Sequence, residues 1–349
     1  MMDCQLDSHI AEKIVPVTEE QNTSITKNLI EIKDLKIYFY TEEGVVKAVE
    51  DVNLHIAKGE TLGLIGESGS GKTVTSLSIL KLLQEPPAKI VSGKILFDND
   101  DLLKLKPDKM RKIRGKKISM IFQDPMTSLN PLYTVQDQIA ENLRIHHNMS
   151  PKEAEKEVIN LMQEVGIPDA KKRSTDFPHQ FSGGMRQRIM IAIALSCKPL
   201  LLIADEPTTA LDVTIQAQVI KLIDSLKEKY NTSVLYITHN FAVIASLADR
   251  IAVMYAGYII EEGGAIEIFE NPLHPYTQDL LASIPRVDRK IGKLEVIQGS
   301  VPNLINPPSG CRFHPRCKKV LKICDKKVPT RIEYSKNHFV QCHLYTEGQ

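Results

Sequence analysis

Long apolar segments are missing from this 349-residue sequence: no run approaches the roughly 20 residues that a membrane-spanning helix needs. A strong overall charge is also missing. The formal net charge is +1, so no basic field points to nucleic acid as a partner. The N-terminal segment carries charges early and has no apolar core, so no signal peptide is predicted there. Together these absences predict a cytosolic protein that reaches a membrane only through a partner.

Cysteine is scarce, and four of the six cysteines gather near the C-terminus. In a cytosolic protein such a cluster favours a metal site over disulfides. Its spacing, C-x5-C-x6-C-x17-C, has no C-x2-C pair of the kind that zinc ribbons prefer, whereas a [4Fe–4S] cluster accepts varied spacings. We therefore predict an iron–sulfur cluster with a structural role, which stabilises a segment that has only a small hydrophobic core. Zinc, with His314 or His343 as further ligands, is the alternative. The clustered residues are Cys311, Cys317, Cys324 and Cys342, and the isolated ones are Cys4 and Cys197.

Patterns typical of strands and helices alternate through most of the chain. Alternating apolar and polar residues predict half-buried strands, short apolar runs predict buried strands, and apolar residues at helical spacing predict helices. This order predicts an α/β fold in which helices cover a mainly parallel sheet. The expected strands are residues 29–40, 45–56, 60–65, 118–122, 200–204, 233–237 and 251–254, and the expected helical segments are 72–83 and a charged lobe over 135–166.

Composition divides the chain into three parts. Residues 1–28 are polar and lack a hydrophobic period, which is typical of a flexible tail. Residues 29–270 hold the α/β pattern, with a helical subdomain expected at about 124–185. Proline becomes frequent beyond this point, so residues 271–349 are expected to form a loop-rich extension that carries the cysteine cluster.

A phosphate-binding loop (P-loop) is predicted between the strand at 60–65 and the helix that follows it. The residues Gly66-Glu67-Ser68-Gly69-Ser70-Gly71-Lys72-Thr73 fit the pattern G-x-x-x-x-G-K-[ST]. Glycines let the backbone wrap closely around phosphates, and the helix N-terminus favours the same anion. Lys72 would neutralise the β- and γ-phosphates of ATP, and the Thr73 hydroxyl would ligate Mg²⁺. Thr75 is also expected to bind the nucleotide.

Two acids, Asp205 and Glu206, directly follow the apolar strand at 200–204. A strand this apolar is buried, so Asp205 is expected at the carboxyl edge of the sheet, where ligands bind in α/β folds. Asp205 would hold Mg²⁺ through water, and Glu206 would orient and polarise the attacking water.

The segment Phe181-Ser182-Gly183-Gly184-Met185-Arg186-Gln187-Arg188 resembles the L-S-G-G-Q signature of ATP-binding cassette (ABC) ATPases. Phe181 replaces the leading Leu and Met185 replaces the Gln, at positions that vary within the family. The resemblance implies a P-loop ATPase fold with an antiparallel β-subdomain and a helical lobe. It also implies that Ser182, Gly183 and Gly184 reach the γ-phosphate of ATP held by a facing subunit, so that ATP binding closes a dimer.

The remaining ABC elements follow in the order that the resemblance requires. Gln123 matches the Q-loop glutamine, which contacts Mg²⁺ or the water. Asp212, in Ala210-Leu211-Asp212, matches the D-loop, which crosses the dimer interface. His239 matches the switch histidine, which holds the γ-phosphate and Glu206. An aromatic that stacks on adenine is expected at Phe39, with Tyr40 as the alternative. The resemblance thus implies Glu206, His239 and Gln123 as catalytic residues and Mg²⁺ at Thr73, Gln123 and Asp205.

Three further stretches are similar to the ATPases of oligopeptide, dipeptide and nickel importers: residues 121–131, 271–277 and 301–343. The dipeptide subunit is the best match and the oligopeptide subunit the next, and the resemblance again favours an iron–sulfur cluster. It implies a peripheral protein at the cytoplasmic face of the membrane, with two permease subunits, a second homologous ATPase and an extracytoplasmic peptide-binding protein as partners.

A soluble ABC ATPase acting on ribosomes or DNA is the alternative from another class. Such proteins usually carry two cassettes or a long coiled-coil insertion, and this sequence has neither.

Overall fold

The computed structural model describes residues 28–209, 211–284 and 297–346, so the expected tail lies outside the described residues except for Asn28. The strands are β1 (Asn28–Thr41), β2 (Gly44–Ala57), β3 (Thr61–Ile65), β4 (Ala88–Phe97), β5 (Asp100–Asp101), β6 (Ile118–Ile121), β7 (Leu201–Asp205), β8 (Ser233–Thr238), β9 (Arg250–Tyr255), β10 (Tyr258–Gly264), β11 (Ile332–Ser335) and β12 (His338–Val340). The helices are α1 (Lys72–Ile79), α2 (Pro107–Arg111), α3 (Pro125–Ser128), α4 (Val135–His147), α5 (Pro151–Glu164), α6 (Ala170–Arg173), α7 (Gly183–Leu195), α8 (Val213–Tyr230), α9 (Phe241–Ala245), α10 (Ala265–Glu270) and α11 (Pro275–Ala282), and η4 (His314–Arg316) is a 3₁₀ turn.

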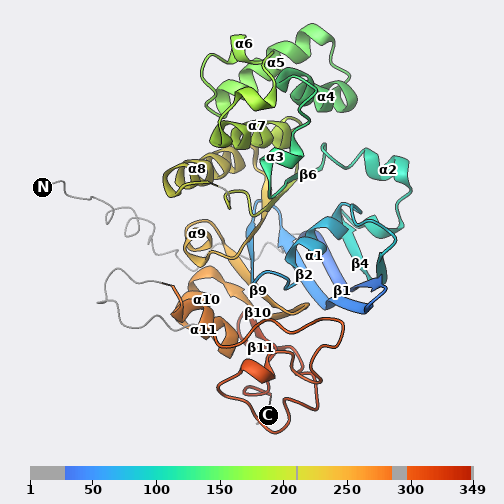
Figure 1. The fold of residues 1–349 in the computed structure, drawn as a ribbon, viewed down its shortest axis with the longest axis vertical. Coiled ribbons are helices and arrows are strands. Elements are labelled where there is room, and N and C mark those ends of the chain that lie inside the picture. The colour runs from blue at the N-terminus through green and yellow to red at the C-terminus, as the bar shows by residue number, and fades with distance from the viewer. Residues whose placement is uncertain (1–27, 210, 285–296, 347–349) are drawn as a thin grey trace, which may run out of the picture.

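A mixed sheet forms the centre of the molecule, in the strand order β11-β12-β10-β9-β3-β8-β7-β6 (Figure 1). The strands from β9 to β6 run parallel to one another, and β10, β12 and β11 continue the sheet in antiparallel fashion. A second sheet, β2-β1-β4-β5, is antiparallel throughout. The predicted α/β fold, with a parallel core and an antiparallel β-subdomain, is confirmed.

Both faces of the central strands are buried, which explains why their sequences are mostly apolar. Along β7, Leu202 and Ala204 pack in one core that includes the helical lobe, whereas Leu201 and Ile203 pack in another core with the antiparallel sheet. Successive side chains of a strand point to opposite faces, so one short strand contributes to both cores. The strand ends at Asp205, on the same edge at which β3 enters the P-loop.

Helices α4 to α7 gather into a lobe at one end of the molecule, away from the antiparallel sheet (Figure 1). Local capping fixes where these helices begin. The hydroxyl of Thr134 accepts the N–H of Asp137 at the start of α4 (3.1 Å), and Ser150 and Glu153 form a capping box at the start of α5. The lobe predicted over 135–166 therefore divides into two helices, since Asn148 ends α4 in the left-handed conformation.

Other elements also depart from the pattern-based expectation. Helix α1 ends at Ile79 and does not reach residue 83, because Lys81 has a left-handed φ of 51°. The strand expected at 251–254 is β9, and a second strand, β10, follows it, because the backbone turns at Ala256 and Gly257, both with positive φ. Strand β4 was not predicted; Gly93, with a φ of 106°, interrupts its alternation.

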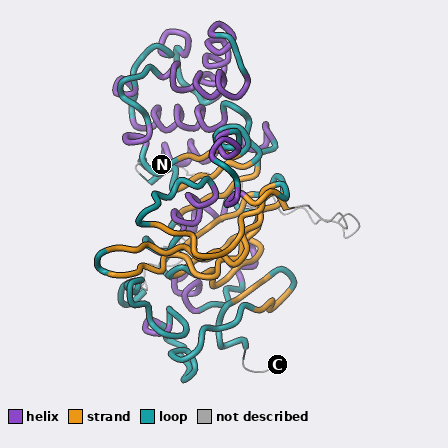
Figure 2. Tube along the Cα trace, turned by 90° about the vertical axis from the view of Figure 1, so that its right-hand side faces the viewer, coloured by secondary structure: helices purple, strands orange, loops and turns teal. Residues whose placement is uncertain are grey.

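The C-terminal hairpin β11–β12 adds to the edge of the central sheet by pairing with β10, with Glu261 opposite Val340. Glu261 is 1% exposed and accepts hydrogen bonds from the N–H groups of Leu273 (2.7 Å) and His274 (2.9 Å). This buried carboxylate thus ties the start of the extension to the sheet. Loops dominate this end of the molecule (Figure 2). Within residues 28–209, 211–284 and 297–346, no helix has both the length and the apolarity to cross a bilayer.

Candidate active site

The P-loop connects β3 to α1, and its glycines pack against the backbones of β2 and β9. Gly71 caps α1 with a φ of 107°, and a Cβ there would lie 2.6 Å from the carbonyl oxygen of Ala48 on β2. A Cβ at Gly66 would overlap the carbonyl oxygen of Met254 on β9. Only glycine fits these two positions, so the backbone is free to approach an anion closely.

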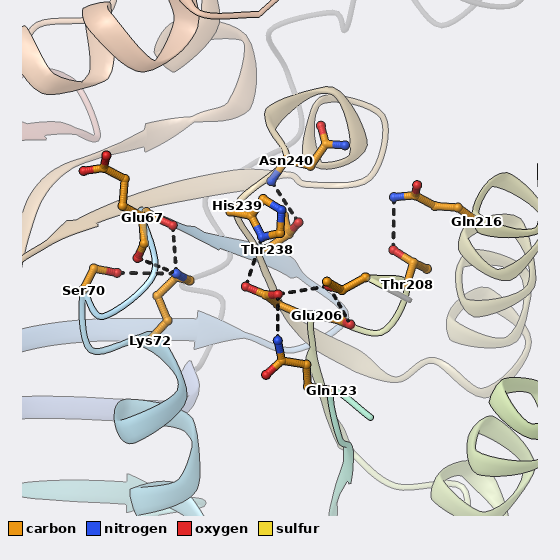
Figure 3. A network of polar contacts seen from close by, with 12 residues as sticks. Glu67, Ser70, Lys72, Gln123, Glu206, Thr208, Gln216, Thr238, His239 and Asn240 are labelled. Atoms are coloured by element: carbon orange, nitrogen blue, oxygen red, sulfur yellow. Dashed lines mark hydrogen bonds and ion pairs between the residues drawn. The ribbon is translucent and has the colours of Figure 1, made fainter. Parts of the chain in front are cut away.

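Lys72 lies across the P-loop, as Figure 3 shows, and is 5% exposed. Its Nζ donates to the carbonyl oxygens of Gly66 (2.8 Å) and Glu67 (3.0 Å). Burial lowers the pKa of Lys72, and the carboxylates of Glu206 and Asp205 oppose that effect. The Lys72 ammonium group lies at the first turn of α1, where the positive end of the helix dipole also favours phosphate oxygens.

Asp205 supplies a buried carboxylate at the carboxyl edge of the sheet, where the sequence predicted it. The residue is 2% exposed, and its Oδ1 has no hydrogen-bond partner among the described residues. Burial raises the pKa of Asp205, and the nearby Thr73 hydroxyl opposes that effect. A carboxylate oxygen without a partner beside a hydroxyl suits Mg²⁺, a hard cation that prefers oxygen ligands. Thr73 and Asp205 thus fit the expected cation.

Three side chains from different segments converge on Glu206 (Figure 3). Its Oε2 accepts from Nε2 of Gln123 (3.1 Å), which follows β6, and from the Thr209 hydroxyl (3.0 Å). Its Oε1 lies 3.2 Å from Nδ1 of His239, which follows β8. The structure therefore brings the three expected catalytic residues together.

The backbone and charge of Glu206 are both unusual. Its φ is 47°, which few residues other than glycine adopt, and its N–H donates to the carbonyl of Ile237 (2.9 Å). Burial would raise the pKa of Glu206, but hydrogen bonds from His239 and Thr209 outweigh that effect and hold it below its ordinary value. Glu206 is consequently a carboxylate at neutral pH and can accept a proton from water.

The signature residues lie apart from this group. The Ser182 hydroxyl caps α7 by accepting the N–H of Met185 (3.4 Å), and the space beside Gly183 is open. In the part of the chain that the structure describes, no hydrogen bond or ion pair links Ser182, Gly183 or Gly184 to the P-loop. Asp212 likewise caps α8 by accepting the N–H of Ile215 (2.9 Å), and Ala210 of the D-loop lies outside the described residues.

Phe39 and Thr75 occupy different surroundings. Phe39 is partly buried and pairs with Val46 of β2, two residues before Ala48, which borders the P-loop at Gly71. Tyr40 is 50% exposed. Thr75 is fully buried, and its hydroxyl donates to the carbonyl of Gly71 (2.9 Å), so in this structure it supports the loop from within α1.

Three contacts of the site were absent from the sequence-based prediction. Thr209 hydrogen-bonds Glu206, and its position three residues later was a local signal that could have indicated it. The hydroxyl of Tyr276 accepts the N–H of Glu67 (2.9 Å), and Arg316 forms an ion pair with the Glu67 side chain (2.6 Å). These two lie more than 200 positions away in the chain, and no local pattern connects them to the P-loop.

The four clustered cysteines are free thiols with raised pKa values at three of them. Burial raises the pKa of Cys311 to about 11 and that of Cys342 to about 12. The N–H of Lys319 donates to Sγ of Cys317 and that of Leu321 to Sγ of Cys324, both at 3.4 Å. Among the described residues, no three His, Cys, Asp or Glu side chains are arranged so as to hold a metal ion.

Comparison with known proteins identifies relatives along most of the chain. Residues 49–209 match the ABC transporter family, and residues 260–324 match the C-terminal region of oligopeptide/dipeptide transporters. The oligopeptide transport ATP-binding protein AppD of Bacillus subtilis (strain 168) is 51% identical over 319 residues, covering 91% of this chain and 97% of AppD. The dipeptide transport ATP-binding protein DppD of the same organism is 51% identical over 318 residues, covering 91% of this chain and 95% of DppD. A dimeric post-hydrolysis structure of the ATP-binding cassette MJ0796, bound to ADP and Pi, is 29% identical with a TM-score of 0.61, covering 68% of this chain and 98% of that one.

Proposed function

This chain belongs to the ATP-binding subunits of oligopeptide and dipeptide ABC transporters, and we propose that it hydrolyses ATP to drive the import of dipeptides or oligopeptides. The observation that carries the proposal is the group around Glu206, which holds a carboxylate between Gln123 and His239 beside the P-loop. The match of residues 260–324 to the transporter C-terminal region supports the peptide-import branch.

Each residue of the site has its own role in phosphoryl transfer. Lys72 and the backbone N–H groups of the P-loop bind the phosphates, and Glu206 orients water and accepts its proton. His239 keeps Glu206 ionised and in place, since its ring hydrogen-bonds that carboxylate. Thr73 and Asp205, with Gln123, would hold Mg²⁺, which would neutralise charge on the phosphate oxygens when bound. Phe39 is our candidate for stacking on adenine, and Thr75 for a contact from α1.

The signature side of the molecule supports a dimer. Ser182 and Gly183 are exposed at the start of α7 and do not contact this chain's own P-loop, so we assign them to ATP bound by a facing subunit. Asp212, exposed at the start of α8, would lie at the same interface. The facing subunit would be a second homologous ATPase, as the family resemblance favours. The dimer would work at the cytoplasmic face of the membrane, with two permease subunits and, indirectly, an extracytoplasmic peptide-binding protein.

We expect the isolated chain to bind ATP but to hydrolyse it slowly, because each complete site needs a second subunit. Assembly with the permeases and the second ATPase should raise turnover by about tenfold or more, since closure of the dimer completes the site. The measurement is ATP-dependent uptake of a labelled dipeptide and a labelled oligopeptide into proteoliposomes that contain the assembled transporter. Uptake of Ni²⁺ in place of either peptide would favour the nickel branch of the family. Full ATPase activity of a monomer, independent of concentration, would contradict the dimer.

For the cysteine cluster, we propose a [4Fe–4S] centre with a structural role, and zinc remains the alternative. The chemistry of the donors supports it, because four thiols near one another can supply four thiolates. Burial, and then electrostatic interaction with Cys311, Cys317 and Cys324, raises the pKa of Cys342, so its sulfur lies within electrostatic range of the other three. A backbone N–H also donates to the sulfur of Cys317 and to that of Cys324, and such donors favour thiolates. Ligation would require the side chains to turn towards one another and lose their protons.

Protein purified without oxygen should therefore be brown and contain about four iron and four sulfide per chain. Cys342→Ser should lose the colour, because it removes one of four ligands, and should speed proteolysis beyond about Gly299. Cys197→Ser is the matched control: this cysteine is also buried but lies outside the cluster, and its loss should leave the colour unchanged. A colourless protein with one tightly bound zinc would rule out iron and sulfide but would still support a structural role for a metal at this site. Four reactive thiols without any metal would rule out both.

A further inference from the structure

Arg316, in the cysteine-bearing extension, forms a two-pronged ion pair with the P-loop residue Glu67. Its Nη1 lies 2.6 Å from Oε2 and its Nη2 lies 3.1 Å from Oε1 of that carboxylate. The Arg316 side chain is 5% exposed and that of Glu67 is 29% exposed. Paired parallel hydrogen bonds to a guanidinium fix orientation as well as distance, and burial of the arginine reduces the screening by solvent.

The guanidinium is itself held in place from the extension and from β9. Its Nε donates to the carbonyl of Gln298 (2.9 Å), and Nη2 approaches the carbonyl of Gly299 (3.4 Å). Its Nη1 also donates to the hydroxyl of Tyr255 at the end of β9 (3.3 Å). All three nitrogens of the guanidinium have partners, so the arginine has little freedom to move. It therefore holds the Glu67 side chain at a fixed position relative to the extension.

Glu67 is joined to Lys72 through its backbone. The Glu67 carbonyl accepts from Nζ of Lys72 (3.0 Å) and from the N–H of Ser70 (3.2 Å), so it participates in the fold of the loop. On its other side, the Glu67 N–H donates to the hydroxyl of Tyr276, a fully buried residue of α11. Movement of Glu67 would therefore change both the loop backbone and the resting contacts of Lys72.

We propose that Arg316 is a positioning residue for the nucleotide site, which clamps Glu67 so that the P-loop keeps the shape that receives phosphates. This inference rests on the proposed function, because it concerns the same ATP site. Arg316 does not reach the reacting atoms; it acts through the loop. The role follows from three observations: the two-pronged pair, the full set of partners on the guanidinium, and the shared contact of Glu67 and Lys72.

The test compares the affinity of the purified full-length chain for Mg·ATP in Arg316→Ala, Glu67→Gln and the double variant. Each single variant should weaken binding by about tenfold, within the range typical of coupling between two sites. The double variant should be no weaker than either single one, because both changes remove the same contact. Arg316→Lys retains the charge but not the fork, so it should fall between wild type and Arg316→Ala. In the assembled transporter, KM for ATP should rise more than kcat falls.

Arg331 provides a matched control, because it also joins the extension to the sheet without touching the P-loop. It pairs with Glu262 (2.7 Å) and donates to the carbonyl of Asn53 (3.2 Å). Arg331→Ala should leave ATP affinity within twofold of wild type. Equal losses of ATP affinity in Arg331→Ala and Arg316→Ala would show that any contact between the extension and the sheet has this effect, and would contradict a specific role of Arg316. Unchanged affinity in both Arg316→Ala and Glu67→Gln would overturn the proposal. Because affinity is the readout, a chain that binds ATP normally yet drives no peptide uptake contradicts the proposed function and leaves the clamp intact.

Discussion

Glu206→Gln should retain ATP binding and lose hydrolysis by about a hundredfold or more, the range expected for removal of a general base. The amide keeps the size of the side chain but cannot take a proton from water. In the native site, hydrogen bonds from His239 and Thr209 keep Glu206 ionised, so the wild-type carboxylate is the form ready to act. In the proposed dimer, ATP binding would close the two subunits and hydrolysis would reopen them, so the variant should accumulate as a closed, ATP-bound dimer.

Three measurements check this result: the ATP dissociation constant, the turnover number, and the mass of the complex with ATP by size-exclusion chromatography with light scattering. Glu164→Gln is a suitable control, because Glu164 is also a hydrogen-bonded carboxylate but sits in the helical lobe, paired with Lys229 (2.7 Å) and Tyr230. It should match wild type in all three. Near-normal turnover in Glu206→Gln would remove Glu206 from the role of activating water.

Much of the fold was predictable because its signals are local. The strand β7 is a run of apolar residues ending at Asp205, and burial on both faces makes such a run diagnostic in an α/β protein. The P-loop was equally clear, because its glycines are required by contacts with neighbouring strands, as at Gly66 and Gly71. The ends of elements were harder to place. Helix α1 stops early at a single left-handed residue, Lys81, that no periodicity encodes.

The group around Glu206 was predictable residue by residue from the resemblance, but not as a geometry. Gln123 and His239 come from separate strands, and only the parallel register of β6, β7 and β8 brings both to one carboxylate. The contacts of Glu67 were not predictable at all. Arg316 lies 249 positions later, in a loop-rich segment without periodicity, and its pairing depends on how the extension folds back over the P-loop. Long-range ion pairs of this kind leave no trace in spacing or composition.

Replacing Lys72 with alanine is expected to have the largest effect on nucleotide affinity. Lys72 is 5% exposed, so when ATP binds its ammonium group must neutralise phosphate charge with little help from solvent. Hydrogen bonds to charged groups contribute about 1.5–3 kcal/mol, so Lys72→Ala should weaken Mg·ATP binding by about ten- to a hundredfold. The fold should remain intact, because Lys72 makes its hydrogen bonds within the P-loop, to the carbonyls of Gly66 and Glu67, and joins no other element to it.

The control for this variant is Lys81→Ala. Lys81 follows the same helix and its Nζ also donates to two carbonyls, those of Leu103 (3.0 Å) and Leu105 (3.1 Å), but it lies at the end of α1 opposite the P-loop. Titration calorimetry with Mg·ATP should show wild-type affinity for Lys81→Ala and a large loss for Lys72→Ala, with similar melting temperatures without nucleotide. If ATP raised the melting temperature of Lys72→Ala as much as that of wild type, the phosphate charge would be met by the backbone alone, and Lys72 would have no part in binding.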